Sequence, residues 1–314
     1  MVVHKIKGPT KLFGSSVITV GAFDGIHLAH QAILKRVKSE SHKLGSPAVL
    51  LTFDPHPTAL LNPPIGLLTP IEEKITILRN LDLTQNVVIL EFTRELAKLE
   101  PEEFVRLYLV ESLGARLVVE GQDHTFGFNA QGSVALLKEL SRKYNFELEI
   151  LPPVFAGTKE IKSGRIRELI KKGEIKKANE MLGREYTLYG TVVEGDKLGR
   201  KLGFPTANIK PEKDKLLPPD GVYLVRTKLA SEVLYGLLYI GSRPTLGTTE
   251  RRVELNIFDF DGNLYGENLL IEFITKIRSD MKFERLNELK KRMGIDKAIA
   301  VKLLQKITEE VFNA

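Results

Sequence analysis

Short apolar runs alternate with longer segments of helical spacing along the first half of the chain. A helical segment follows each of the first four runs. Strands that alternate with helices form right-handed crossovers and a parallel sheet, which binds ligands at the carboxyl ends of its strands. The expected strands are residues 17–20, 48–53, 86–92, 116–120 and 146–151.

Helix ends in this half are indicated by single residues. Thr69, Pro70 and Glu72 combine an N-cap hydroxyl, a proline at the first helical position and a glutamate three residues after the cap. Gly45 and Gly114 stand where helices are expected to stop. The first half therefore predicts an α/β domain with a Rossmann-like parallel sheet.

The pattern changes in the second half, where strand-like runs follow one another without helices. Consecutive strands of this kind form antiparallel sheets that close on themselves. We expect an all-β six-stranded antiparallel barrel, with a C-terminal helix over residues 286–311. The strand-like runs are residues 186–193, 221–229, 233–240, 251–260 and 269–278, and residues 204–209 are the candidate sixth strand.

The 314 residues correspond to two domains of ordinary size. Between the two patterns, residues 163–183 predict two short basic helices, with Gly173 between them and Gly183 as the stop. A flexible linker rich in proline or serine does not occur there. We place the domain boundary at Gly183, which gives domains of residues 1–183 and 184–314.

Composition narrows the class of protein. The chain has no cysteine, which excludes disulfides, thiolate metal sites and a cysteine nucleophile. No apolar run approaches the ~20 residues of a membrane helix, and the N-terminus lacks a secretory pattern, so we expect a cytoplasmic protein. The net charge of +6 comes from cations interleaved with acids, which favours a basic surface over nucleic-acid binding.

A glycine-containing segment, residues 199–208, has the composition of a phosphate site. Gly195, Gly199 and Gly203 allow positive φ and a close approach of the backbone to a ligand. Arg200 and Lys201 add positive charge between the second and third of these glycines.

Two polar residues close the same segment. Thr206 and Asn208 offer neutral oxygen ligands. Such ligands suit a hard cation such as Mg²⁺, held between the protein and the phosphates.

These residues and four later strings resemble the riboflavin kinase module. The strings are GRKLGFPTAN, then GVYLVR, IGSRPTLG, VELNIFDFDGNLYGE and IRSDMKF. In bacteria this module commonly follows an FMN adenylyltransferase domain in one bifunctional protein, and the resemblance covers essentially the whole chain. It implies that Gly199, Arg200, Lys201 and Gly203 contact ATP phosphates.

One carboxylate in the later strings is the candidate general base of the kinase. Residues 253, 255 and 257 make one face of their strand wholly apolar, and Glu254 lies on the other face. The resemblance implies that Glu254 takes the proton from the riboflavin 5′-hydroxyl, and that Arg278 lies in a segment that closes over the flavin. The alternative for Glu254 is an exposed strand glutamate paired with Arg251 or Arg243.

The first expected strand ends in VGAFDGIHLAH, residues 20–30, which lacks a GxGxxG motif. His27 and His30 share one face at a helix start, where backbone amides favour an anion. The string is similar to the adenylyltransferase signature GxFDGxHxGH. This resemblance implies that both histidines hold the ATP triphosphate and that Ser163 and Arg167 contact phosphate. The implied residues of the nucleotide and flavin clefts are Asp24, Asp54, His56 and Asp123.

This half departs from the family pattern at a few positions. Ala29 replaces the glycine between the histidines, and His124 replaces a common phenylalanine. Lys162 and Gly164 stand where the family has phosphate-binding hydroxyls. The first domain therefore either adenylates FMN or keeps the fold with that activity weakened or lost.

The residues together predict an enzyme that uses riboflavin, FMN and ATP, with Mg²⁺ as cofactor. One alternative is a riboflavin kinase with a silent first domain. Another is a non-catalytic flavin- or RNA-binding regulator, although a binding protein has no need of a general base at Glu254. The sequence does not predict the oligomeric state, and we expect neither a membrane nor a nucleic acid as partner.

Overall fold

The computed structural model describes residues 1–60, 65–195, 199, 203–230, 232–243 and 248–312. The chain divides into two compact units, Met1–Ser163 and Gly164–Ala314. The sequence analysis placed the two helices of residues 163–183 in the first domain, whereas this division places them in unit 2. The boundary at Gly183 stays a prediction.

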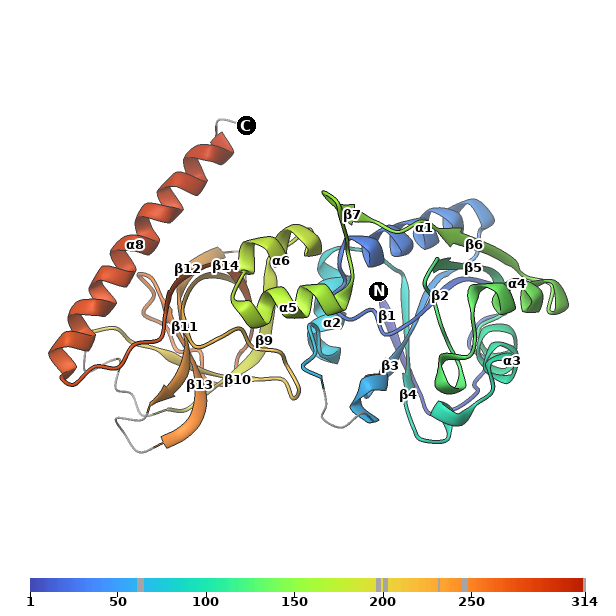
Figure 1. The fold of residues 1–314 in the computed structure, drawn as a ribbon, viewed down its shortest axis with the longest axis horizontal. Helices are drawn as coiled ribbons and strands as arrows, with labels where there is room; N and C mark the ends of the chain where they lie inside the picture. The colour runs from blue at the N-terminus through green and yellow to red at the C-terminus, as the bar shows by residue number, and fades with distance from the viewer. Residues whose placement is uncertain (61–64, 196–198, 200–202, 231, 244–247, 313–314) are drawn as a thin grey trace. The chain divides into compact units, whose positions relative to one another are not determined.

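Unit 1 is built on a six-stranded parallel sheet, ordered β1-β4-β3-β2-β5-β6 within the described residues (Figure 1). The five predicted strands are confirmed, and the structure adds β1, which pairs with β4 at one edge. The bounds are β1 Val2–Ile6, β2 Ser16–Val20, β3 Ala48–Asp54, β4 Asn86–Glu91, β5 Ala115–Gly121 and β6 Glu147–Leu151.

Helices follow the strands as predicted. Short 3₁₀ turns lie at Pro57–Leu60, Leu96–Lys98 and Phe128–Ala130, and a small hairpin, β7 Phe155–Ala156 with β8 Lys159–Glu160, precedes the end of the unit. The helices are α1 Leu28–Leu44, α2 Ile71–Asn80, α3 Pro101–Phe104 with its π-helical continuation Val105–Ser112, and α4 Val134–Lys143.

The sheet is buried on both faces, which explains why its strands read as continuous apolar runs. Every residue of β2 is buried. Ile18 and Val20 pack into one hydrophobic cluster with residues of α3 and α4, whereas Val17 packs into another with Val37 of α1.

The strand order fixes where a ligand crevice opens. From β2 the chain continues to β3 and β4 on one side, while β5 and β6 lie on the other side. Successive crossovers therefore diverge between β2 and β5. This is a topological switch point, and the carboxyl ends of β2 and β5 flank the crevice.

The predicted cap of α2 is wrong in detail. Pro70 occupies the N-cap position, and no side chain caps this helix. The Thr69 hydroxyl accepts a hydrogen bond from the Gly25 amide at 2.7 Å. A contact with the β2–α1 loop has therefore replaced the local cap.

Unit 2 contains a closed antiparallel barrel with the strand order β10-β13-β12-β11-β14-β9 in its described part (Figure 1). The predicted barrel is confirmed, including the candidate sixth strand, which pairs with both β9 and β13. The strands are β9 Tyr186–Val193, β10 Ala207–Pro211, β11 Gly221–Leu229, β12 Glu232–Arg243, β13 Thr248–Ile257 and β14 Asn268–Ser279.

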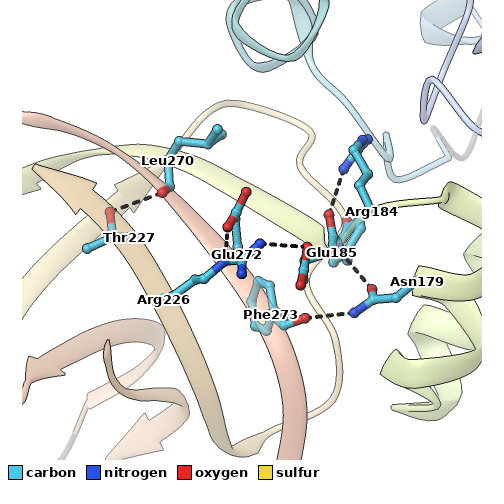
Figure 2. A network of polar contacts seen from close by, with 9 residues as sticks. Asn179, Arg184, Glu185, Arg226, Thr227, Leu270, Glu272 and Phe273 are labelled. Carbon is cyan, nitrogen blue, oxygen red and sulfur yellow. Dashed lines mark hydrogen bonds and ion pairs between the residues drawn. The ribbon is translucent and has the colours of Figure 1, made fainter. Parts of the chain in front are cut away.

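Among the described residues, the helices α5 Ser163–Lys172, α6 Ile175–Leu182 and α8 Leu286–Phe312 accompany the barrel. Polar contacts join α6 to the strands (Figure 2). Asn179 donates to the Phe273 carbonyl at 2.9 Å and accepts from the Tyr186 amide at 2.7 Å. Nearby, Arg226 forms ion pairs with Glu272 and Glu185. The connector helix α6 is therefore bound to the barrel through β9 and β14.

Candidate active sites

The two predicted histidines of unit 1 lie together at the start of α1. His27 is the N-cap residue, and its Nδ1 accepts from the His30 amide at 3.4 Å. Their rings are stacked, with centroids 3.6 Å apart and planes inclined by 17°. The pair stands beside the end of β2, where helix amides favour an anion.

Positive charge beside His30 comes from a buried lysine. Burial, followed by the neighbouring His27 and Lys74, lowers the pKa of His30 well below its usual value. Lys74 is itself buried and donates from Nζ to the Ala22 carbonyl at 2.7 Å and to the Thr52 hydroxyl at 3.2 Å. His30 is therefore a neutral hydrogen-bonding group next to a fixed ammonium. Lys74 was not predicted as a site residue. The sequence feature that could have indicated it is a lysine among the buried apolar positions of α2.

Asp24 is placed in the loop between β2 and α1, but its carboxylate is already used. It is buried and accepts from the amides of Leu68, at 3.1 Å, and Thr69, at 2.8 Å. Ser163 reaches the same loop and donates from its hydroxyl to the Asp24 carbonyl at 2.7 Å. Asp24 thus holds the loop, and Ser163 is brought to it from a distant part of the sequence.

Asp123 lies next to Lys162, one of the residues that differ from the adenylyltransferase pattern. Asp123 is exposed just beyond β5, and its Oδ2 lies 3.1 Å from Lys162 Nζ. Lys162 also lies 3.2 Å from Glu160 Oε1. The hydrogen bonds to Asp123 and Glu160 raise the pKa of the ammonium group. A cation therefore stands at the crevice where the family pattern has a hydroxyl.

The remaining predicted residues of this half are more scattered. Asp54 is exposed at the end of β3, and His56 Nδ1 lies 2.7 Å from the Thr58 hydroxyl in the turn that follows. Ala29 lies in the first turn of α1. Arg167 belongs to α5 within unit 2, so its predicted phosphate contact stays a prediction.

In unit 2, two glycines make room for the predicted metal-binding side chains. A Cβ atom built on Gly195 would lie 1.9 Å from Asn208 Nδ2, and one built on Gly199 would lie 2.8 Å from Thr206 Oγ1. Close approach, rather than the predicted positive φ, therefore explains both glycines. Gly203 does have positive φ, at 85°.

Glu254 lies in a row of polar residues that runs across three strands. Its direct partners in the sheet are Asn208 on β10 and Tyr239 on β12. Directly opposed residues point to the same side of a sheet. Val253 and Leu255 are buried on the opposite side, as predicted. Glu254 itself is only 5% exposed, so the alternative of an exposed strand glutamate is wrong.

Tyr239 was not singled out from the sequence. Its hydroxyl donates to the Ser242 carbonyl at 3.2 Å. Burial, followed by the negative charge of Asp280, raises the pKa of the phenol, which therefore stays protonated at neutral pH. The sequence feature that could have indicated Tyr239 is its position between the apolar residues Leu238 and Ile240, which are both fully buried.

Arg278 is held by a carboxylate of α8. Its Nε donates to Asp296 Oδ2 at 2.8 Å, and Arg292 Nε lies 3.0 Å from the other oxygen of Asp296. Arg278 and Asp296 are both nearly buried. The arginine therefore joins the end of β14 to α8. Arg200 and Lys201, predicted to contact phosphates, lie outside the described residues.

A magnesium site made of acidic side chains does not occur in the described part of the chain, which has no cluster of three or more His, Cys, Asp or Glu residues suited to a metal. Thr206 and Asn208 provide oxygen atoms beside two glycines, and Glu254 is directly opposite Asn208. Few protein ligands and a neighbouring phosphate are typical of Mg²⁺ sites. The donor set thus fits a cation that ATP also binds.

Comparison with known proteins identifies the family of each half of the chain. The FAD synthetase family model matches residues 10–165, and the riboflavin kinase family model matches residues 182–304. Fold and site thus define an α/β domain of the nucleotidyltransferase type followed by a barrel of the riboflavin kinase type. The chain belongs to the family of bifunctional riboflavin kinase/FMN adenylyltransferases.

Its relatives match over nearly their full lengths. The bifunctional riboflavin kinase/FMN adenylyltransferase of Bacillus subtilis (strain 168) is 34% identical over 296 residues, which cover 91% of this chain and 92% of that protein. The protein of the same name from Listeria monocytogenes is 37% identical over 273 residues, 86% of each chain.

A solved structure also matches. It is described as a macrolide-efflux protein from Streptococcus pneumoniae, and it has a TM-score of 0.83 and 29% identity, covering 96% of this chain and 99% of that one. Among the described residues, no helix has the length and apolar character needed to cross a membrane.

Proposed function

We propose that the chain catalyses two successive transfers from ATP. Unit 2 phosphorylates riboflavin to FMN, and unit 1 transfers the adenylyl group of a second ATP to FMN, which gives FAD. The kinase assignment is carried by the buried Glu254 directly opposite Asn208, beside glycines that admit the side chains of Thr206 and Asn208. The adenylyltransferase assignment is supported by the stacked histidines at the switch point.

In the kinase reaction, Glu254 accepts the proton of the riboflavin 5′-hydroxyl as that oxygen attacks the γ-phosphorus of ATP. ADP leaves, and FMN carries the new phosphate ester. General-base catalysis of this kind contributes about 10² to 10⁴ in rate. Gly199 and Gly203, with Arg200 and Lys201 from the sequence prediction, are proposed to line the phosphates.

Thr206 and Asn208 are the residues proposed to hold Mg²⁺ with the ATP phosphates. The cation supplies charge neutralisation on the phosphate oxygens. The side chains of Thr206 and Asn208 keep the nucleotide beside Glu254.

In the adenylyl transfer, a phosphate oxygen of FMN attacks the α-phosphorus of ATP, and pyrophosphate leaves. His27 and neutral His30 are proposed to donate hydrogen bonds to the triphosphate, and the Lys74 ammonium provides nearby positive charge. Preorganised donors of this kind stabilise charge that develops in the transition state. Asp54, His56 and Asp123 are proposed as cleft residues, with Ser163 and Arg167 toward the phosphates. In the kinase reaction of unit 2, Arg278 is proposed to lie toward the flavin.

The test is to incubate the purified full chain with riboflavin and MgATP and to separate the flavins by chromatography. FAD as product supports both activities. FMN alone means that unit 1 is silent, which the departures at Ala29, Lys162 and Gly164 would explain. Formation of neither product refutes the proposal. A parallel reaction supplied with FMN measures the second step by itself.

A further inference from the structure

A buried carboxyl group lies beneath the crevice of unit 1 and has no part in the proposed chemistry. Glu120 of β5 is 2% exposed. Its Oε1 accepts from the Val20 amide at 2.7 Å and from the Thr19 hydroxyl at 3.3 Å. Residue pairing between β2 and β5 runs only as far as Ile18 and Val118. Glu120 therefore extends the connection between these strands to the edge of the crevice.

The other oxygen of this carboxyl group faces a histidine. Glu120 Oε2 lies 3.3 Å from His124 Nδ1, and the His124 ring stacks on Phe126 with centroids 5.6 Å apart. The His124 amide donates to the Gly121 carbonyl at 3.1 Å, which closes a tight turn. Asp123 lies inside this turn. Its position therefore depends on a ring that is held on one edge by Glu120 and on one face by Phe126.

Burial shifts the pKa values of the two side chains in opposite directions. Burial raises the pKa of Glu120 well above its usual value. Burial lowers the pKa of His124 to about 4, although the negative charge of Asp123 opposes this shift. With Glu120 protonated and His124 neutral, the Glu120 hydroxyl donates to Nδ1 across the 3.3 Å contact, and the proton of His124 is on Nε2.

The charged surroundings of the pair do not reverse this arrangement. The charged neighbour of the ring is Asp123, which pairs with Lys162. Of the described residues that contact Glu120 from β2, Val20 contributes a backbone amide and Thr19 a hydroxyl, and neither carries charge. A side chain without a ring nitrogen at position 124 would leave the Glu120 hydroxyl without this acceptor. The acid and the histidine therefore belong together.

We infer that Glu120 and His124 are a positioning pair for adenylyl transfer: Glu120, anchored to the end of β2, orients the His124 ring, and the ring fixes the turn that carries Asp123 at the switch point. This inference rests on the proposed adenylyltransferase activity of unit 1. It assigns a function to a residue that departs from the family pattern.

The experiment measures FAD formation from FMN and MgATP by the full chain, from pH 6 to 9, for wild type, Glu120→Gln and His124→Phe. Phenylalanine keeps the stack on Phe126 but cannot accept the hydrogen bond, so kcat is expected to fall about tenfold or more, since a 1 Å misplacement costs about 10² in rate. Glutamine accepts from Val20 and donates to His124. It should therefore retain the wild-type rate at pH 7 within about twofold.

The pH profile separates positioning from a merely structural role. Above the raised pKa of Glu120 the carboxylate no longer donates to His124, so wild-type kcat should decline at alkaline pH. Glutamine does not ionise, and Glu120→Gln should lack this decline. FMN formation from riboflavin by the same chains should stay within about twofold of wild type, which provides an internal control in unit 2.

Each outcome decides a separate question. If wild type forms FAD and both variants match it in rate and pH profile, the positioning pair is refuted while the proposed function stands. If wild type forms FMN but no FAD, the adenylyltransferase proposal fails, and the inference fails with it. If His124→Phe does not fold, the pH profile of Glu120→Gln decides alone. A Glu120→Gln profile identical to that of wild type then refutes the positioning pair.

Discussion

The two candidate sites are assembled in opposite ways. In unit 1 the polar residues come from loops that end at the same edge of a parallel sheet, such as His27 after β2 and Asp123 after β5. In unit 2 the polar row of Asn208, Glu254 and Tyr239 lies within the strands, and the register of the barrel places these residues side by side. One site depends on loop conformation and the other on strand pairing.

This difference determines which substitutions each site can accept. A loop residue can change while the sheet is maintained, and Ala29, Lys162 and His124 all lie in loops or at the first turn of a helix. A residue in the barrel row has a direct partner on each side. The side chains of Thr206 and Asn208 also fill space that a Cβ at Gly199 or Gly195 would need. Variation is therefore expected in unit 1 rather than in the barrel row.

The largest expected effect is on the barrel row. Glu254→Gln keeps the shape of the side chain but removes the base, so FMN formation should fall by about 10² to 10⁴. FAD formation from supplied FMN should be unchanged. Steady-state rates of both reactions measure this. Glu232→Gln, at an exposed position of β12, is the matched control, and full kinase turnover by Glu254→Gln would exclude Glu254 as the base.

The second effect concerns the loss of unfolding free energy at acid pH. Histidine protonation should contribute to this loss in unit 1, because all six histidines lie there. The pKa of His124 is lowered to about 4, so its contribution to stability is present above the unfolded value of about 6.5 and is lost as the pH falls toward 4. His124→Phe removes this titrating group. Between pH 6.5 and 4 the variant should therefore lose less unfolding free energy than wild type, by on the order of 3 kcal/mol.

Urea unfolding at several pH values, followed by a probe of unit 1, measures this change. His42→Gln replaces an exposed histidine of α1 and should unfold with the same pH dependence as wild type. Equal acid sensitivity of His124→Phe and wild type would contradict the assignment of the lowered pKa to residue 124.

A third effect tests the attachment of α6 to the barrel (Figure 2). Asn179→Ala removes the hydrogen bonds to Phe273 and Tyr186 and leaves backbone groups without these partners, which should cost about 1–3 kcal/mol of unfolding free energy. Thermal unfolding of unit 2 measures it. Glu180→Ala, on the exposed side of the same helix, should have little effect, and equal stability of both variants would show that these bonds are dispensable.

The smallest effect concerns the departures in unit 1. Ala29→Gly combined with Lys162→Ser and Gly164→Thr should raise the rate of FAD formation at least about tenfold. Lys162 already replaces one of the two hydroxyls, so the gain is one hydroxyl–phosphate hydrogen bond, which contributes about 1.5–3 kcal/mol. No heavy atom lies within 4 Å of a Cβ built on Gly164, so the backbone there has room for a side chain. Lys172→Ser on α5 is the control. An unchanged rate would mean that these residues do not limit the reaction.

The sequence was a good guide to the elements and to local site chemistry. Strand alternation around Glu254 and helical spacing after His27 depend on neighbouring residues, and both are present in the structure. It was a poor guide to side chains whose partners are remote. Thr69 fitted the pattern of a cap but accepts a bond from Gly25. The bond from Arg278 to Asp296 of α8 was not predicted, and its flavin contact stays a prediction.

The sequence by itself determined the order of elements, the change from a parallel sheet to a barrel, and the family motifs, because hydrophobic periodicity and glycine positions act over a few residues. Only the tertiary structure joined Glu120 to Val20, Lys162 to Asp123 and Glu254 to Tyr239. The reason is physical. Crossovers and strand register bring together residues far apart in the chain, and burial then sets which of them carry charge.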